Sequence, residues 1–237
     1  MNVLGIIPAR YNSSRFPGKP LVDIQGKTMI ERVYRQAVKA KLLNKVVIAT
    51  DDERIFEHVQ AFGGEVLMTS GKHVNGTERC AEVVEKLSGY NAIVNIQGDE
   101  PFIQPEQIDL LAEAFNDTSV QIATLIKQTN NLSLINSPNS AKVVFNANNE
   151  AMYFSRAVIP YTENQTGIYY KHIGMYGYRS DILPKLAQLK PTPLEQTERL
   201  EQLRWLEHGF SIKVLETEME TLSVDTPDDL NKINSNS

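Results

Sequence analysis

The chain has 237 residues, of which 41% are hydrophobic and 22% charged, a composition typical of a globular protein large enough to bury a full core. Its formal net charge of −5 argues against nucleic acid or an anionic membrane surface as a general partner. Any site for phosphate groups must therefore be built from cations that are gathered locally.

Cys80 is the only cysteine, which excludes an internal disulfide and fits a reducing compartment. The amino terminus lacks the features of a signal peptide, and no apolar run approaches the roughly 18 residues of a membrane span. We therefore expect a cytoplasmic protein without membrane insertion. Because Cys80 shares an apolar helical stripe with Val83 and Leu87, a buried structural thiol is favoured over a nucleophile.

The first predicted element is a strand at residues 3–7, an apolar run rich in β-branched side chains. Pro8 ends it, and the loop that follows carries Arg10, Arg15 and Lys19 among small and turn-forming residues. Open α/β sheets bind ligands at the carboxyl edge of their strands, where this loop begins. The three cations indicate a site for a polyanion, with a nucleoside triphosphate as the expected ligand; a solvated basic loop is the alternative.

The spacing of this loop excludes two commoner phosphate-binding loops. A Walker A loop requires a glycine where Ser13 stands and a Ser or Thr where Pro20 follows Lys19. A dinucleotide-binding loop requires G-x-G-x-x-G after the strand, whereas only Gly5 and Gly18 are present. The charge for a polyanion therefore comes from side chains and not from a glycine cradle.

The next segments alternate between helix and strand. Thr28 is placed to cap a helix that continues through residues 30–38, and residues 46–50 form a short buried strand. A helix around residues 55–62 stops at a Gly-Gly pair, and residues 65–68 form a third strand. This β-α-β-α order predicts an α/β fold with a doubly wound, mostly parallel, Rossmann-like sheet.

A polar loop at residues 69–76 precedes a helix that is opened by Gly76, with Thr77 as its expected cap. Free backbone N–H groups at such a helix start suit a base edge or a phosphate. From the residues alone, a plain helix start with Arg79 on a solvated face explains the pattern equally well.

The strand predicted next, at residues 92–96, delivers Asp99 to the sheet edge that the basic loop also reaches. A carboxylate suits Mg²⁺, which takes one or two such ligands and completes its shell with water and substrate phosphates. A lone carboxylate after a strand is more often a turn former or a helix cap. Residues 101–104 delay the next helix to about Pro105, which weakens the capping explanation.

From about residue 121 the alternation loosens. Residues 121–127, 142–145 and 151–154 are rich in strand formers and predict a smaller mixed or antiparallel β excursion. We expect one domain over residues 1–237, in which residues 130–190 or so form a sugar-binding and dimerisation subregion.

The last part of the chain is predicted to contain one amphipathic helix over residues 193–206, in which Glu201 and Gln202 fall on a solvated face. Residues 212–215 form a strand, and Asp225 stands at the end of a further strand before a closing helix.

A family resemblance is carried by Pro8-Ala9-Arg10-x-x-Ser13-Ser14-Arg15-x-Pro17-Gly18-Lys19-Pro20-Leu21. This run resembles the signature of sugar nucleotidyltransferases, specifically the cytidylyltransferases that activate 3-deoxy-D-manno-octulosonate (Kdo) for lipopolysaccharide biosynthesis. Further segments resemble the same family in order along nearly the whole chain. The resemblance implies a homodimer that uses Mg²⁺ to convert CTP and Kdo into CMP-Kdo and pyrophosphate.

The resemblance also implies roles for individual residues. Arg10, Arg15 and Lys19 would bind the β- and γ-phosphates and stabilise the leaving pyrophosphate. Asp99 and Asp225 would hold one or two Mg²⁺ ions. The expected contacts to the sugar acid are Gln97, Arg156, His172, Tyr176, Glu201 and Gln202. The other expected substrate contacts are Pro8, Ala9, Ser13, Thr50, Asp51, Gly76, Thr77 and Arg79.

Three alternatives stay open at this point. The substrate can be a related acidic sugar, either an 8-amino analogue of Kdo or a sialic acid. A nicotinamide-dependent oxidoreductase is disfavoured by the missing glycine fingerprint. A non-catalytic nucleotide-sensing module would bind CTP but release no pyrophosphate.

Overall fold

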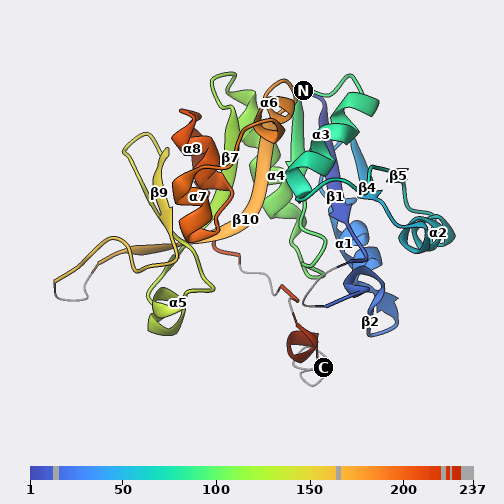
Figure 1. Ribbon diagram of the computed structural model, residues 1–237, viewed down its shortest axis with the longest axis horizontal. Helices are drawn as coiled ribbons and strands as arrows, with labels where there is room; N and C mark the ends of the chain where they lie inside the picture. The colour runs from blue at the N-terminus through green and yellow to red at the C-terminus, as the bar shows by residue number, and fades with distance from the viewer. Residues whose placement is uncertain (13–15, 164–166, 220–222, 225, 231–237) are drawn as a thin grey trace.

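A computed structural model describes residues 1–12, 16–163, 167–219, 223–224 and 226–230. Its central feature is a sheet with the strand order β11-β7-β10-β6-β1-β4-β5, to which β8 and β9 are attached through β10 (Figure 1). The strands are β1 (Val3–Ala9), β4 (Lys45–Thr50), β5 (Val66–Met68), β6 (Ala92–Asn95), β7 (Ile122–Thr129), β8 (Lys142–Phe145), β9 (Ala151–Ser155), β10 (Tyr169–Arg179) and β11 (Ile212–Glu216). A separate hairpin joins β2 (Asp23–Ile24) to β3 (Lys27–Thr28).

The helices cover both faces of this sheet. They are α1 (Met29–Ala37), α2 (Glu53–Ala61), α3 (Gly76–Lys86), α4 (Pro105–Glu113), α5 (Leu132–Asn136), α6 (Leu183–Ala187), α7 (Pro193–Glu198) and α8 (Gln202–Glu207), with short 3₁₀ turns at Lys19–Leu21 and Ala114–Asn116. One core lies between the sheet and α1, α2 and α4, and a second core lies on the face that α3, α6 and α8 cover. The buried strands β1, β4 and β6 supply apolar side chains to both cores.

The pairing pattern confirms the predicted α/β fold. Strand β1 pairs in parallel with β4 and β6, and β4 pairs in parallel with β5. The second half adds antiparallel pairs of β10 with β6, β7 and β8, and of β8 with β9. The carboxyl ends of β1, β4 and β6 therefore meet at one edge of the sheet, and the antiparallel strands extend the sheet beside that edge.

The ends of the first helices agree with the sequence, except at α3. Thr28 caps α1 by accepting a 3.4 Å bond from the backbone N of Glu31. The cap of α3 is Asn75 and not Thr77: the Asn75 side chain accepts a 2.8 Å bond from the backbone N of Glu78. Thr77 lies too late in the chain to reach the free N–H groups of the first turn, and its side chain is buried instead.

The single helix predicted over residues 193–206 is wrong. Arg199 adopts a left-handed conformation with φ 53° and ends α7, and α8 starts at Gln202. The break directs Leu200 into the core together with Leu203. The spacing of apolar residues cannot reveal such a break, because it requires only one residue with an unusual φ.

The carboxyl-terminal segment differs partly from the prediction. Residues 223 and 224 are not in a strand, whereas residues 227–230 are helical as expected. Asp225 lies outside the described residues. Cys80 is buried in α3, as predicted. Within the described ranges, every helix falls short of the length and apolar character that a bilayer crossing requires.

Candidate active site

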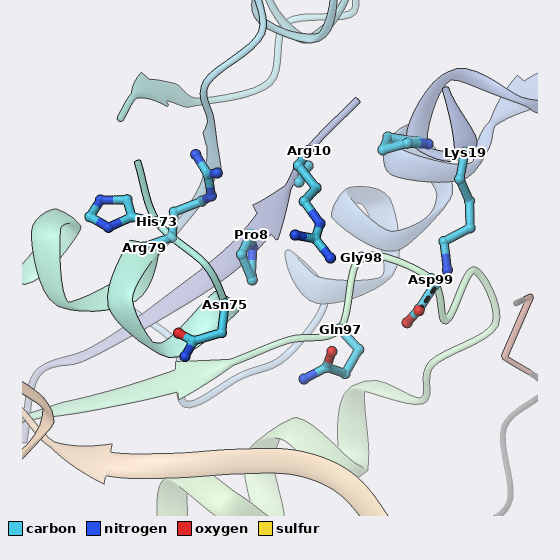
Figure 2. Close-up of a pocket in the computed structure, with 12 residues that line it drawn as sticks. Pro8, Arg10, Lys19, His73, Asn75, Arg79, Gln97, Gly98 and Asp99 are labelled. Atoms are coloured by element: carbon cyan, nitrogen blue, oxygen red, sulfur yellow. Dashed lines mark hydrogen bonds and ion pairs between the residues drawn. The ribbon is translucent and has the colours of Figure 1, made fainter. Parts of the chain in front are cut away.

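A first cavity of about 230 Å³ lies where the sheet edge meets the start of α3 (Figure 2). It is lined by Pro8, Ala9, Arg10, Lys19, Pro20, His73, Asn75, Gly76, Arg79, Gln97, Gly98 and Asp99. These residues come from the end of β1 and the loop after it, from the loop before α3 and the first turn of α3, and from the turn after β6. The sheet therefore brings together three segments that the sequence analysis treated separately.

Lys19 joins the amino-terminal loop to the turn after β6. Its Nζ lies 2.8 Å from Asp99 Oδ2, and this ion pair is drawn in Figure 2. Lys19 Nζ also donates a 3.0 Å bond to the carbonyl of Val224, whose backbone N donates a 2.9 Å bond to the carbonyl of Asp99. The described carboxyl-terminal residues thus lie directly beside the turn. Ser13, Arg15 and Asp225 lie outside the described residues, so their predicted roles stay predictions.

Gly98 allows the turn after β6 to pass close to β1. A Cβ atom at this position would lie 2.9 Å from the carbonyl oxygen of Pro8, a distance that real Cβ atoms essentially never show. Because the opposing atom belongs to the backbone, it cannot move aside cheaply. The missing side chain therefore sets how near the turn that carries Asp99 comes to β1.

Arg79 is not on a solvated face. Its side chain is 4% exposed, donates a 2.6 Å bond to Thr69 Oγ1 and lies 3.2 Å from Asp51 Oδ2. Asp51 is therefore connected to the first cavity through Arg79 and does not itself line it. Thr50 and Thr77, also predicted to contact substrate, are buried and line neither of the two cavities of the site.

His73 and Asn75 are cavity residues that the sequence analysis did not assign. The His73 ring is bonded to Glu82, and its Nδ1 lies 3.8 Å from Glu78 Oε2. Desolvation would raise the pKa of Glu82, but bonds from Lys86, from the backbone N of Ser70 and from His73 outweigh it and lower that pKa to about 2. Glu82 therefore remains charged and holds the loop before α3 in place.

A second cavity of about 520 Å³ adjoins the first. It is lined by Gln97, Glu100, Lys127, Leu134, Ser137, Asn139, Ser140, Ala141, Arg156, Lys171, His172, Ile173, Gly174, Tyr176, Leu200, Glu201, Gln202 and Ser223. Gln97 lines both cavities, and its Nε2 donates a 2.9 Å bond to the carbonyl of Gly174. All six residues predicted to contact a sugar acid line this second cavity.

Two titratable groups in the second cavity have shifted pKa values. Desolvation lowers the pKa of His172 to about 3, so the ring is neutral at pH 7. Its Nε2 lies 2.9 Å from Thr124 Oγ1, and the rings of Phe154 and Tyr176 flank it at 5.0 and 5.4 Å. Desolvation raises the pKa of Glu201 to about 7, so this carboxyl is close to half protonated near neutral pH.

The prediction that Glu201 and Gln202 lie on a solvated face is wrong, because the break before α8 turns them inward. Gln202 is only 4% exposed. Its Nε2 is buried and has no hydrogen-bond partner among the residues that the structure describes. A buried amide donor at a cavity wall is expected to bond an ordered water or a ligand.

Arg156 is held largely by backbone carbonyls. Its Nε donates a 2.8 Å bond to Glu198 O, its Nη1 a 2.8 Å bond to Pro138 O and its Nη2 a 3.4 Å bond to Arg199 O. The backbone N of Arg156 donates a 2.9 Å bond to the Glu198 carboxylate. The guanidinium therefore ties α7 to the loop before β8, and most of its donors are not directed at the cavity.

Lys127 and Lys171 also line the second cavity and were not anticipated. They lie 44 positions apart in the chain and become neighbours only through the register of β7 with β10, which pairs them directly. Local sequence patterns do not reveal this register. Only knowledge of how β7 pairs with β10 could have identified Lys127 and Lys171 as cavity residues.

The donor set of the first cavity suits a hard divalent cation that also binds phosphate. Asp99 is the acidic residue among the described residues of its lining, and the described part of the chain holds no cluster of three His, Cys, Asp or Glu side chains fit to bind a metal unaided. Mg²⁺ commonly takes one or two carboxylates and obtains its other ligands from substrate phosphates and water. The described residues thus fit a metal that arrives with a phosphorylated ligand.

Comparisons with known proteins identify the family of the chain. Residues 4–217 match a family model described as cytidylyltransferase. A 3-deoxy-manno-octulosonate cytidylyltransferase of Parabacteroides distasonis is 54% identical, over 98% of this chain and 96% of the relative. That of Fusobacterium nucleatum is 50% identical over the same shares of the two chains.

Solved structures extend the comparison. A CMP:2-keto-3-deoxy-manno-octonic acid synthetase complexed with CTP superimposes with a TM-score of 0.94 at 42% identity, covering 99% of this chain and 98% of that one. A cytidylyltransferase of Leptospira borgpetersenii, 18% identical with a TM-score of 0.66 over 99% of this chain and 86% of that one, shares the fold. The chain therefore belongs to the cytidylyltransferase family, among its 3-deoxy-manno-octulosonate cytidylyltransferases.

Proposed function

We propose that this enzyme transfers a cytidylyl group from CTP to Kdo and releases pyrophosphate, making CMP-Kdo for lipopolysaccharide biosynthesis. The observation that carries the proposal is that two cavities adjoin at Gln97, one lined by cations and a carboxylate and the other by hydrogen-bonding groups. A nucleotide in the first cavity can place its α-phosphate beside an acceptor hydroxyl in the second. The names and the CTP complex of the relatives support the choice of CTP and Kdo.

The phosphate end of CTP belongs with Arg10 and Lys19. Charge builds up on the leaving pyrophosphate as the bond to the α-phosphorus breaks, and fixed cations stabilise that charge. Arg15 is proposed for the same task from the sequence. The ion pair of Lys19 with Asp99 holds the ammonium in the cavity before a triphosphate arrives.

Mg²⁺ is the proposed cofactor, held by Asp99 and, from the sequence, by Asp225. When bound, it would neutralise phosphate charge and lower the pKa of the attacking sugar hydroxyl. The hydrogen bond that Val224 N donates to Asp99 O supports a shared role of the two segments.

The cytidine end is assigned to the wall near the start of α3. Pro8, Ala9, Gly76 and Arg79 line this wall. Thr50, Asp51 and Thr77 support the wall from behind, and Ser13 stays a candidate contact from the sequence. A helix start such as that of α3 has backbone N–H groups without partners inside the helix, which suit a base edge.

The sugar acid is assigned to the second cavity. Gln97, Tyr176 and Gln202 offer hydrogen bonds to its hydroxyls, and His172 offers a bond without a charge because its ring is neutral. Glu201 and Arg156 complete the set that the family resemblance implies. With both substrates bound, the enzyme acts chiefly by positioning the acceptor hydroxyl in line with the bond that breaks.

A cytoplasmic homodimer is the proposed state of the enzyme. A groove of about 430 Å³ within the predicted dimerisation subregion is lined in part by Leu132, Val158 and Tyr161. These side chains are 56%, 40% and 86% exposed. Exposed apolar side chains that gather in this way are typical of an association surface, and a second copy of the chain is the proposed partner.

Asp99→Asn tests the assignment of the first cavity. The amide keeps the shape of the side chain but loses the charge that Lys19 and Mg²⁺ would share, so we expect kcat to fall by about 10²- to 10³-fold while the thermal midpoint changes little. Pyrophosphate release from CTP and Kdo is the measurement. Asp181→Asn is the matched control, because Asp181 is a surface residue with a 61% exposed side chain. Near-normal release by Asp99→Asn would remove Asp99 from the mechanism.

A further inference from the structure

Tyr11 connects the two described parts of the loop after β1, residues 10–12 and 16–19. The backbone N of Gly18 donates a 2.9 Å bond to the carbonyl of Tyr11. Gly18 has a φ of 72°, and a Cβ atom there would lie 3.2 Å from the Tyr11 ring and from its hydroxyl. The ring therefore packs on the backbone that leads into Lys19, and Arg10 directly precedes Tyr11 in the chain. The position of this one side chain thus affects both cations that the loop contributes to the first cavity.

Arg54, in the first turn of α2, lies against the Tyr11 ring. Its Cζ is 3.3 Å from the ring centroid. This distance is well inside the range of about 6 Å over which the face of an aromatic ring attracts a cation. Tyr11 also packs against the core that lies between the sheet and α1, α2 and α4. The ring therefore joins the loop after β1 to the segment that follows β4.

Asp52 fixes the orientation of the Arg54 guanidinium. Arg54 Nε donates a 2.9 Å bond to Asp52 Oδ1, and Arg54 Nη2 donates a 2.6 Å bond to Asp52 Oδ2. Asp52 also caps α2, and its own backbone N donates a 3.2 Å bond to Thr50 Oγ1 at the end of β4. Hydrogen bonds from Arg54 lower the pKa of Asp52 although desolvation opposes them, so this carboxylate is charged at neutral pH. The plane of the guanidinium is therefore set by the junction of β4 and α2.

A surface ion pair by itself contributes little to stability, and the side chain of Arg54 is 57% exposed. This pair differs from others on the surface because it holds the ring of a loop that brings Arg10 and Lys19 to one cavity. Two cations at one site repel each other until an anion arrives, so the loop needs contacts that keep its shape. The ion pair with Asp99 fixes the end of the Lys19 side chain, and the Tyr11 ring packs on the backbone that carries it.

We propose that Arg54, held by Asp52, stacks on Tyr11 and thereby keeps the loop after β1 in the conformation that binds the triphosphate. Arg54 is then a positioning residue, because it acts through the ring on Arg10 and Lys19 and touches no substrate. This inference rests on the proposed function. The affinity for a ligand falls in proportion to the fraction of the protein in the binding conformation. Loss of the stack therefore weakens CTP by no more than the stack contributes to holding the loop.

Calorimetric titration of the whole enzyme with CTP and with CMP, in Mg²⁺ and without Kdo, tests this proposal. CMP carries the nucleoside but lacks the β- and γ-phosphates. We expect Tyr11→Leu and Arg54→Met each to raise the Kd of CTP about three- to tenfold, the range for loss of a cation–π contact and its ion pair, and to leave the Kd of CMP within about twofold. Arg35→Met is the matched control, because Arg35 is 49% exposed, pairs with Glu31 and lies over the Phe62 ring, none of which belongs to this loop.

Further variants separate the stack from the charge of Arg54. Tyr11→Leu changes no charge, so a purely electrostatic effect of the arginine on the triphosphate would leave this variant like the wild type. The double variant should bind CTP no more weakly than Tyr11→Leu alone, because both substitutions remove the same contact. Tyr11→Phe keeps the ring and should bind CTP like the wild type. Thermal melts verify folding, and if Tyr11→Leu does not fold, Tyr11→Met replaces it.

An unchanged Kd of CTP in Arg54→Met or in Tyr11→Leu, equal weakening of CTP and CMP, or additive losses in the double variant would overturn the proposal. A wild-type enzyme that binds no CTP, or that releases no pyrophosphate from CTP and Kdo, would instead contradict the proposed function. The two failures are therefore distinguishable.

Discussion

Glu201 and His172 line the same cavity and have pKa values that are shifted in opposite directions. Desolvation raises that of Glu201 from 4.5 to about 7 and lowers that of His172 from 6.5 to about 3. As pH rises from 4.5 to 7, the unfolded state loses the Glu201 proton first, so the free energy of unfolding falls. As pH falls from 6.5 to 3, the unfolded state gains the His172 proton first, so the free energy of unfolding also falls in this direction.

These two effects oppose each other between pH 4.5 and 6.5. In Glu201→Gln only the His172 effect remains. We therefore expect the free energy of unfolding to rise with pH across this window by up to about 1.4 kcal/mol per pH unit. His172→Gln should give the opposite slope. Chemical denaturation at several pH values measures both slopes, with the exposed Glu85→Gln as control. Parallel pH profiles of the two variants would contradict the assigned shifts.

At the residue scale, the sequence predicted groups that stand next to strand ends and missed groups that depend on strand register. Lys19 and Asp99 were both predicted and lie 2.8 Å apart, because parallel strands bring their carboxyl ends to one edge. Lys127 and Lys171 could not be predicted, because their pairing needs the register of β7 with β10. Burial of Arg79 was also outside the reach of local patterns, since Asp51 and Thr69 approach it from separate segments.

At the scale of elements, the turn after β6 depends on Gly98. A methyl group there would meet the Pro8 carbonyl at 2.9 Å and push the turn away from β1. We expect Gly98→Ala to lower kcat about 10- to 100-fold, because a small displacement of Asp99 misaligns the reacting groups. Gly71→Ala is the control, since a Cβ there meets only Asp51, at 3.6 Å or more. Steady-state pyrophosphate release measures both, and an unchanged kcat in Gly98→Ala would show that the turn tolerates the shift.

A small third apolar cluster fastens the carboxyl-terminal segment beside the first cavity. Ile24, Met29 and Val224 are buried in it, and Phe102 and Leu230 pack against it. The cluster thus joins Val224 and Leu230 to the segment after β6 and to the hairpin before α1. Thr226 and Asp229 bond each other at the start of the short terminal helix, with 2.8 Å between Thr226 Oγ1 and Asp229 Oδ2.

Leu230→Ala tests this connection. The cluster is separate from the two main cores, so its loss should change the thermal midpoint little but loosen the segment that holds Val224 against Lys19 and Asp99. We expect a several-fold lower kcat and a higher Mg²⁺ concentration for half-maximal rate. Leu194→Ala, at a 39% exposed leucine on α7, is the control. A lower midpoint with unchanged Mg²⁺ dependence would assign Leu230 to stability alone.

The elements themselves were largely predictable, whereas some of their ends were not. The strands of the first half followed from apolar runs between turn signals, and α4 begins at Pro105 as predicted. The break at Arg199 and the cap at Asn75 were missed. Each is decided by one backbone angle or one side-chain bond, which periodicity does not report.

At the scale of the whole molecule, the parallel half of the sheet supplies the first cavity and the antiparallel half supplies most of the second. Among the described residues, one sheet runs through both halves, and the β2–β3 hairpin is separate from it. The single domain over residues 1–237 stays a prediction. The dimerisation role of the subregion at residues 130–190 stays a prediction. A dimer contact at this place would explain why Tyr161 and Leu132, which line the groove near α5, are exposed in the single chain.

Tyr161→Asp tests the dimer. A charge in the middle of an apolar association surface should weaken self-association by at least about tenfold, because the carboxylate must be desolvated on binding. Sedimentation equilibrium measures the dissociation constant, with Val38→Asp at a 49% exposed position on another face as control. A wild type that is monomeric at all concentrations, or a Tyr161→Asp variant that associates normally, would exclude this surface.

The most direct test of the central claim is pyrophosphate release by the wild-type enzyme with Mg²⁺, across CTP, UTP and ATP and a panel of Kdo, its 8-amino analogue and a sialic acid. If the two adjoining cavities bind a cytidine triphosphate and a sugar acid as proposed, we expect release only when CTP and an acidic sugar are both present, with Kdo giving the highest kcat/KM. Release without any sugar, equal rates with all three nucleotides, or no release from CTP and Kdo would contradict the account.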